Sequence, residues 1–546
     1  MRFRMIAAAL LALLSSHASA FDKDKASRYP SPDLNNPTVN GLTAHGPITC
    51  APGETCPASG LSVRPQGGLV DVPLSVLFGD AVPARTYGAV CDGTHDDTDA
   101  LAKAAASGKR VIFPPGVCTT TAGITFVSGT KWNATVSRAT EIRATAVISA
   151  DQMIGGNNVS DVEVTGFNLN MQKGLFPSKQ TTVLYFNNAY YGPAAGYRIN
   201  VSNNYVPGAT SGGITVDNTI DVKLNDNEVT DTYRDAIRCG TCKTVKALRN
   251  YVHDAPNMAN GFRAIIIGSS QDVVANDNTI AALRKSDGGE GVFAFDFGGT
   301  VRFTIANNQM NDVESFLDLE QGSAFGNITG NTLVGKITSA ATVNGAAKGL
   351  YCINMGCSHI RFSGNDISRV YNPVHIEGGY DYSIFGNLLH DFYGAGILAS
   401  PVTPGSYINT GRPDGTVDAI VISGNSILNG GLYQAGSQSG INVRAYTGVA
   451  VGNFISGYAF AWDILDFNEN PNFETAHNLM GDNGQSPDKF AGITNHRGRR
   501  EMYGTGSPNG TVAGKPGDTY FNRQGGAGNT YWVKESGTDS SGWVAK

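Results

Sequence analysis

The sequence has few charged residues, no long internal apolar run and no basic excess. Charged side chains make up 16% of the 546 residues, against roughly 25% in an average soluble domain. Without an internal run of about eighteen apolar residues, an integral membrane protein is not expected. Lys and Arg number 40 against 46 Asp and Glu, and a general nucleic-acid binder would need clustered cations to displace the counterions of phosphates.

Glycine and asparagine are abundant instead. Gly accounts for 68 residues, about one in eight, while 41% of residues are hydrophobic. That apolar content excludes a disordered chain. The length would ordinarily suggest three or four domains, but the Gly- and Asn-rich composition favours β structure with many turns.

The first twenty residues have the pattern of a secretory signal peptide. Arg2 and Arg4 form a basic start, residues 6–14 an apolar stretch, and Ala18-Ser19-Ala20 a small-residue cleavage site. We therefore expect residues 1–20 to direct secretion to the periplasm or the extracellular space, with no membrane partner.

The cysteines fall into four close pairs. A Cys-x-x-Cys motif in a cytosolic protein would suggest zinc or redox chemistry, whereas local disulfides are expected after an export signal. The sequence leaves the connectivity open. The pairs are Cys50 and Cys56, Cys91 and Cys118, Cys239 and Cys242, and Cys352 and Cys357.

The chain changes character along its length. Residues 21–80 are rich in Pro, Gly, Ser and Thr and are predicted to be a linker or a loosely folded head. Asp96, Asp97 and Thr98 then offer helix caps to an alanine-rich helix near 98–107, and residues 109–116 form a short strand that ends in a turn.

From about 155 to 481 the sequence repeats a unit of two alternating strands joined by a turn and followed by Asn. The shortest spacings between these Asn residues are 22 and 23 residues, which is typical of a solenoid with variable loops. Because the alternation within each unit has period two, the solenoid is predicted to be a parallel β-helix in which each Asn amide bonds to its equivalent in the next coil. The repeated positions are Asn204, Asn227, Asn250, Asn278, Asn308, Asn331, Asn365, Asn387, Asn425, Asn453 and Asn478.

The start of this region resembles a known family. Tyr87–Thr98 (YGAVCDGTHDDT), followed by Val111–Gly116 (VIFPPG), is similar to the opening of the pectate-lyase-like superfamily. The resemblance implies a right-handed parallel β-helix over residues 81–500, with a capping helix at its start. Cys91 and Cys118 depart from the usual pattern, and a disulfide between them would tie the first strand across that helix.

The C-terminal residues 501–546 are separate again. They resemble a short tail found on phage tail-fibre and tailspike-like proteins, and we expect a small β module with exposed aromatic residues. The module is interpreted as a solenoid cap, or as a surface for glycan contact or trimerisation. Homotrimer formation is therefore an expectation from the resemblance at both ends.

Aligning the coil strands predicts an acidic patch on one sheet. Within each strand two side chains face outward, and this places the candidate catalytic residues Asp296, Asp318, Glu320, His375 and Glu377 together. The alignment sets Asp296 directly beside Glu320, and Asp318 beside Cys352. Stacked carboxylates repel one another, so such a ladder usually has a cation, a shared proton or a function. The candidate substrate-binding residues are Arg238, Arg263, Asn354 and Arg444.

Two chemistries suit these residues. In glycoside hydrolysis one carboxyl group is the acid and another the nucleophile or base, and we expect Glu320 to pair with Asp296 at short range or with Glu377 at longer range. In β-elimination of a uronate, Ca²⁺ or Arg neutralises the substrate carboxylate while Lys, Arg or His removes a proton. His375 suits either scheme.

The leading hypothesis is a secreted polysaccharide-degrading enzyme, a hydrolase rather than a lyase. Hydrolysis would need no cofactor, whereas a lyase would use either Ca²⁺ or Arg to neutralise the substrate carboxylate. The Asn-Thr-Asp, Asp-Asp, Gly-His-Gly and Arg-Ile-Lys set of polygalacturonases is absent from the solenoid, so no named pectinase activity is predicted. The remaining alternative is a rod that binds glycans without catalysis.

Overall fold

The computed structural model divides the chain into two compact units, Met1–Ala81 and Val82–Lys546. The predicted signal peptide, Cys50, Cys56 and Asn354 lie outside the described residues. The first unit contains a small antiparallel sheet of β1 (Thr38–Val39), β2 (Leu42–Thr43), β3 (Ser62–Pro65) and β4 (Val72–Pro73). The described residues are 38–39, 42–43, 62–65, 72–73, 81–175, 181–188, 196–258, 263–285, 292–338, 347–353, 356–401, 416–432, 440–457, 464–466, 473–476, 478–480, 493–496 and 499–546.

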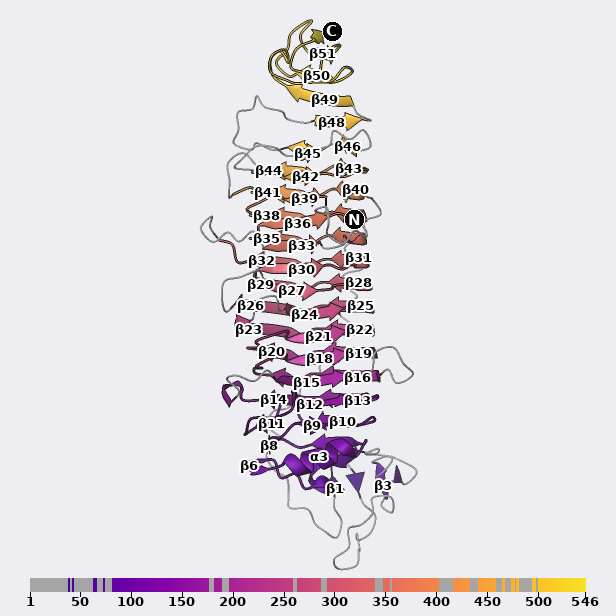
Figure 1. Cartoon of the computed structure of the whole chain (residues 1–546), viewed down its shortest axis with the longest axis vertical. Helices are drawn as coiled ribbons and strands as arrows, with labels where there is room; N and C mark the ends of the chain where they lie inside the picture. Colours follow the sequence, from indigo (N-terminus) through magenta and orange to yellow (C-terminus); the bar gives the residue numbers. More distant parts are fainter. Residues whose placement is uncertain are drawn as a thin grey trace, which may run out of the picture. The chain divides into compact units, whose positions relative to one another are not determined.

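The second unit is a parallel β-helix whose coils stack one strand at a time onto three long sheets (Figure 1). The sheet that carries the acidic residues is called the site sheet. Its strands are β9 (Ile124–Thr125), β12 (Gln152–Asn157), β15 (Thr182–Asn187), β18 (Ile214–Asp217), β21 (Ile237–Gly240), β24 (Arg263–Gly268), β27 (Phe293–Asp296), β30 (Ser315–Leu319), β33 (Lys348–Cys352), β36 (Asn372–Glu377), β39 (Ile397–Ser400), β42 (Ile441–Val443) and β45 (Ile464–Asp466).

The other two sheets complete each coil. The second sheet contains β7 (Arg110–Phe113), β10 (Lys131–Ala134), β13 (Val162–Thr165), β16 (Gly196–Ser202), β19 (Thr219–Asn225), β22 (Lys243–Leu248), β25 (Gln271–Asn276), β28 (Val301–Ala306), β31 (Ala324–Thr329), β34 (Ser358–Ser363), β37 (Tyr380–Phe385), β40 (Asp418–Ser423), β43 (Gly448–Val451) and β46 (Phe473–Ala476). The third sheet contains β6 (Asp92–Asp96), β8 (Gly116–Thr120), β11 (Thr140–Ala144), β14 (Phe167–Asn170), β17 (Tyr205–Val206), β20 (Glu228–Thr230), β23 (Tyr251–Met258), β26 (Thr279–Lys285), β29 (Gln309–Val313), β32 (Thr332–Gly335), β35 (Asp366–Ser368), β38 (Leu388–His390), β41 (Ser426–Leu428), β44 (Phe454–Ser456) and β47 (Leu479–Met480).

The predicted asparagine ladder is confirmed at the corner between the second and third sheets. Each side-chain amide donates to the side-chain oxygen of the next ladder Asn, as in Asn308 to Asn331 at 2.8 Å, and all ten links from Asn204 to Asn478 are present. The residue before a ladder Asn has a left-handed backbone, such as Asp277 with φ 58° and Gly330 with φ 66°. Gly, Asn and Asp tolerate that conformation best, and they occupy most of these positions.

The N-terminal end of the β-helix is closed as the family resemblance implied. Helix α3 (Thr98–Ala106) covers the interior with Leu101 and Ala104, which are fully buried. The Asp97 carboxylate accepts the backbone N–H groups of Val90 and Thr119, at 2.7 and 3.2 Å, and therefore ties the entering strand to the first coil. The expected disulfide between Cys91 and Cys118 is present.

The C-terminal residues have a hydrophobic cluster of their own. Strands β48 (Ile493–His496), β49 (Arg499–Gly504), β50 (Thr519–Asn522), β51 (Tyr531–Lys534) and β52 (Trp543–Ala545) form mostly antiparallel pairs. Met502, Val512, Tyr520 and Trp543 pack together in this module. The aromatic residues are thus partly internal, since Trp543 is buried and donates its indole N–H to the Val512 carbonyl at 2.7 Å.

The remaining short elements are β5 (Ala81–Pro83) and the 3₁₀ turns η3 (Ala84–Tyr87) and η4 (Lys173–Leu175). Within the described ranges, the helices are too short or too polar to cross a membrane.

Candidate functional site

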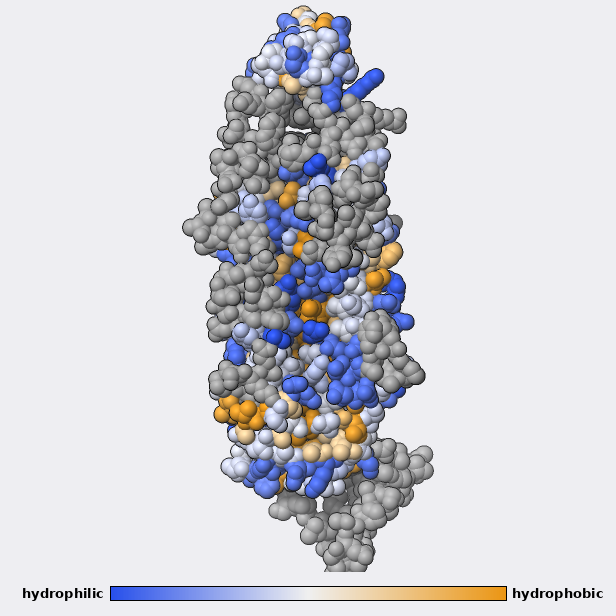
Figure 2. Space-filling view, viewed as in Figure 1, coloured by the Kyte–Doolittle hydropathy of each residue, from blue (hydrophilic) through white to orange (hydrophobic). Residues whose placement is uncertain are grey.

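The middle strands of the site sheet carry a column of outward-facing side chains that differs from the predicted one. Ile266 pairs with Asp296, and Asp296 pairs with Asp318 on the neighbouring strand. The predicted pairing of Asp296 with Glu320 is therefore wrong by two residues. The inward-facing residue of β27 that pairs with Ile265 is Phe295, whereas the predicted alignment places Phe293 there. Figure 2 shows that hydrophilic side chains gather over these middle strands, with apolar surface between them.

Tyr351 occupies the next position of the column. Asp318 pairs with Tyr351, and Tyr351 pairs with His375, so the predicted pairing of Asp318 with Cys352 is wrong by one residue. Cys352 is fully buried and forms a disulfide with Cys357. The inward position suits this half-cystine because it behaves as a small apolar side chain.

Arg263 lies between the two aspartates. Its Nε is 3.3 Å from Asp296 Oδ2 and its Nη2 is 3.3 Å from Asp318 Oδ2. The side chains of Arg263, Asp296 and Asp318 are 11%, 9% and 6% exposed. Arg263, predicted to bind substrate, is thus engaged with the acidic residues themselves.

Burial shifts both aspartates toward their protonated forms. It raises the pKa of Asp296 to about 6, against the opposing effect of Arg263. Burial and then the neighbouring Asp296 charge raise the pKa of Asp318 to about 7. Asp318 Oδ1 is buried without a hydrogen-bond partner among the described residues. The pair therefore retains a proton near neutral pH, with an oxygen on Asp318 that still lacks a partner.

Glu320 brings a third carboxylate to the pair. One oxygen from each of Asp296, Asp318 and Glu320 lies within 4.8 Å of the others. Glu320 follows β30 directly and is more exposed than the two aspartates. The three carboxyl groups predicted to act together are thus together, although in a different arrangement.

The same three carboxylates are close enough together to contact a single cation. Ca²⁺ prefers six to eight oxygen ligands, whereas Arg263 already contacts two of the three carboxylates and burial favours their neutral forms. The described donors therefore do not fit a resident Ca²⁺ ion. The other acidic and sulfur cluster, around Asp97, contains Cys91 and Cys118, whose sulfurs are joined in a disulfide.

His375 and Glu377 lie further along the sheet. His375 Nε2 is 3.3 Å from Glu377 Oε1, and burial together with Lys348 lowers the pKa of His375 to about 3. His375 Nδ1 has no hydrogen-bond partner among the described residues. His375 is thus a neutral imidazole, and Glu377, whose pKa is raised by burial, is two strands from Glu320.

Lys348 was not singled out in the sequence. Its ammonium group lies 5.6 Å from the Tyr351 ring and 5.1 Å from the Tyr371 ring, and burial lowers its pKa to about 8. Tyr351 itself lies 5.1 Å from the His375 ring. Reading Cys352 as an inward residue would have identified Tyr351 as an outward one. Lys348 stands three residues before Tyr351 on the same strand, whereas Tyr371 comes from the next coil.

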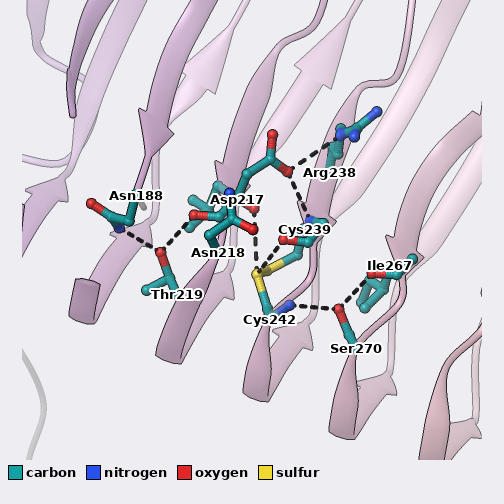
Figure 3. The surroundings of a disulfide bond; sticks show 12 residues. Asn188, Asp217, Asn218, Thr219, Arg238, Cys239, Cys242, Ile267 and Ser270 are labelled. Carbon is teal, nitrogen blue, oxygen red and sulfur yellow. Dashed lines mark hydrogen bonds and ion pairs between the residues drawn. A yellow bond between two sulfur atoms is a disulfide. The ribbon is translucent and has the colours of Figure 1, made fainter. Parts of the chain in front are cut away.

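The remaining predicted cations lie away from the carboxylate cluster. Arg238 is two strands before β27 and forms ion pairs with Asp217 at 3.4 Å and with Asp235 at 3.9 Å. Figure 3 shows Arg238 and Asp217 meeting beside the Cys239–Cys242 disulfide at the end of β21. Arg444 is exposed after β42, two strands beyond Glu377.

Comparisons with known proteins support the fold. No family model and no curated protein matches the sequence. Among solved structures, an N-terminal fragment of bacteriophage phi29 gene product 12 is 15% identical, covers 73% of this chain and 70% of its own, and has a TM-score of 0.51.

Two further solved structures are more distant in shape. The A-module of the Azotobacter vinelandii mannuronan C-5 epimerase AlgE6 is 15% identical over 73% of this chain and 99% of its own, with a TM-score of 0.43. A tailspike of E. coli bacteriophage HK620, solved with a hexasaccharide, is 11% identical over 79% and 81%, with a TM-score of 0.46. The chain is a right-handed parallel β-helix with the pectate-lyase-like fold that its opening motif resembles.

Proposed function

We propose that this protein cleaves glycosidic bonds of a secreted or cell-surface polysaccharide by carboxylate acid/base catalysis. The observation that carries the proposal is the cluster of Asp296, Asp318 and Glu320, whose oxygens lie within 4.8 Å of one another. Like charges at this separation are retained in a fold only where a proton or a counter-charge offsets their repulsion. Here the Arg263 guanidinium is the counter-charge, and the aspartate pair retains a proton.

The three carboxyl groups divide into an acid and a base. A general acid must be protonated at the working pH, and Asp318, with a pKa of about 7, meets that requirement. Glu320 is the most accessible carboxyl group of the three and is assigned as the nucleophile or base. Asp296 assists because its charge raises the pKa of Asp318 and so helps to keep that group protonated.

The test is a screen of neutral and anionic polysaccharides with product mass spectrometry. Hydrolysis adds the mass of water to the products, and activity should fall in Asp318→Asn and Glu320→Gln. Asp381→Asn is the matched control, because Asp381 is an exposed aspartate on the second sheet. If both site variants degrade the substrate as fast as the wild type, the assignment is wrong.

A second candidate, β-elimination of a uronate, is favoured by one observation. Lys348 lies one strand beyond Asp318, and its pKa, lowered to about 8, leaves part of it neutral and able to accept a proton near neutral pH. His375, two strands beyond Asp318 with a pKa of about 3, is neutral but a weak base. Unsaturated products that absorb in the ultraviolet, without the mass of water, would establish elimination. If the protein binds one of the glycans but releases no product from any of them, the result would instead favour a rod that binds glycans without catalysis.

A further inference from the structure

Phe293 makes a contact that the proposed chemistry does not use directly. The Arg263 guanidinium carbon lies 4.8 Å from the centre of the Phe293 ring, and the two residues are register partners on β24 and β27. Phe293 is 5% exposed. A cation held against an aromatic face in a desolvated site gains more than it would at the surface.

The Phe293 ring also stacks with a second aromatic ring of the site sheet. The Tyr351 ring lies nearly parallel to Phe293, at 5° and 6.2 Å between centroids. Between their strands runs β30, where the register partner of Phe293 is the small residue Ser315. Phe293 therefore contacts Arg263 of β24 and Tyr351 of β33.

The orientation of the Arg263 guanidinium matters because it contacts two carboxylates at once. Its Nε and Nη2 are each 3.3 Å from one aspartate, and the Asp235 carboxylate accepts the Arg263 backbone N–H at 3.2 Å. The backbone contact fixes the start of the side chain, whereas the ring fixes the guanidinium plane. A rotation of that plane would weaken both ion pairs together.

We propose that Phe293 is a positioning residue of the site: its ring holds the Arg263 guanidinium between Asp296 and Asp318 and so sets the pH at which this pair loses its proton. The proposal concerns the carboxyl pair of the protein itself. It rests on the proposed function only for its consequence on catalysis, and it is therefore tested first without substrate.

Other charges face the same pair and stay constant in the test. Glu320 and Asp235 oppose ionisation of Asp296, and Glu320 also opposes that of Asp318. Lys348 lies on β33, and His375 and Glu377 lie on β36 beyond Tyr351. Since Phe293 carries no charge, its replacement leaves the charges around the pair unchanged.

The experiment is a carboxyl titration of the full chain by infrared difference spectroscopy, with Asp296→Asn and Asp318→Asn assigning the bands. In Phe293→Leu the guanidinium loses its aromatic face, so the pair should titrate about 0.5 to 1 pH unit higher. Phe293→Tyr keeps the ring and should restore the wild-type titration. Phe316→Leu, a buried phenylalanine that packs against Phe295, is the matched control and should cause no shift.

An unchanged titration in a folded Phe293→Leu protein would overturn the proposal. If that variant does not fold, Arg263→Lys provides the second measurement, because it keeps the charge but loses the planar contact, and it should also shift the titration upward. Where the enzyme is active, the alkaline limb of its pH–rate profile, over which the general acid Asp318 loses its proton, should move with the titration. A shifted titration in a protein without hydrolytic activity would contradict the proposed function and leave this inference standing.

Discussion

Asp296 lies directly beside Asp318 on neighbouring strands of the site sheet, and Arg263 contacts both carboxylates at 3.3 Å. The pair combines burial and like charge, which move carboxyl pKa values toward neutrality, with one counter-charge that opposes the shift. The same geometry bears on activity and on stability, and the two can be measured separately.

The first prediction concerns activity. Asp318→Asn removes the proton donor while keeping the shape of the side chain, so turnover of the polysaccharide identified in the screen should fall by roughly 10² to 10⁴. Initial rates at saturating substrate measure this loss. A fall of the same size in the Asp381→Asn control would show that the effect is not specific to the site.

The second prediction concerns pH and stability. In the unfolded chain Asp318 ionises near its usual pKa of 3.8, whereas in the folded protein its pKa is about 7. The folded state therefore binds more protons over this range, and the contribution of Asp318 to stability declines as the pH rises from about 4 to about 7. Asp318→Asn should gain stability relative to the wild type over that window, by a few kcal/mol, and hold the gain above it.

The measurement is the difference between the melting temperatures of the variant and the wild type, from pH 5 to pH 8. The comparison with the wild type is needed because other groups also make stability depend on pH. The pKa of His375 is lowered from its usual value of 6.5 to about 3 in the folded protein, so the contribution of His375 to the free energy of unfolding rises as the pH rises from about 3 to about 6.5. His375→Gln should accordingly show the opposite trend, gaining on the wild type as the pH falls. A gap for Asp318→Asn that stays constant with pH would contradict the assigned ionisation.

The repeat made the fold predictable from the sequence. Asn residues such as Asn227 and Asn250 recur every 23 residues, and a hydrogen-bonded ladder can form only if the coils stack in that register. The opening motif of residues 87–98 was equally informative. Within it, the Asp97 carboxylate accepts the backbone N–H of Cys91, and Cys91 forms the disulfide with Cys118.

The site was less predictable because its register depends on packing across coils. Two segments, 293–296 and 295–298, each place Phe at the two inward positions and can be aligned with Ile265–Gly268 of the preceding coil. Only the second segment, which the structure shows to be the correct one, also ends in Gly. Likewise, Arg263 reads as an exposed cation in the sequence. Its partners Asp318 and Phe293 come from two different later coils, a relationship that no local pattern contains.

The third prediction tests the ladder. Asn308 accepts hydrogen bonds from the backbone and side chain of Asn278 and donates to Ala275 and Asn331. Asn308→Ala leaves these buried groups without partners and should reduce the free energy of unfolding by about 3 kcal/mol or more. Chemical denaturation measures this loss. Asn311→Ala, at an exposed position on β29, should change stability by less than about 0.5 kcal/mol, and equal losses in both variants would argue against the ladder.

The fourth prediction compares two disulfides by the length of chain that each encloses. Cys91 and Cys118 are 27 residues apart, whereas Cys239 and Cys242 are 3 apart. Closing the longer loop restricts the unfolded chain more, so replacing the first pair by Ser should destabilise the protein by about 3 to 4 kcal/mol, and replacing the second by about 2 kcal/mol. Thermal unfolding of the two double variants, each beside oxidised wild type, gives the comparison. If the Cys239/Cys242 variant is the less stable of the two, loop closure does not account for the effect of the short disulfide. The disulfide would then act mainly by supporting native packing at the end of β21, beside Arg238.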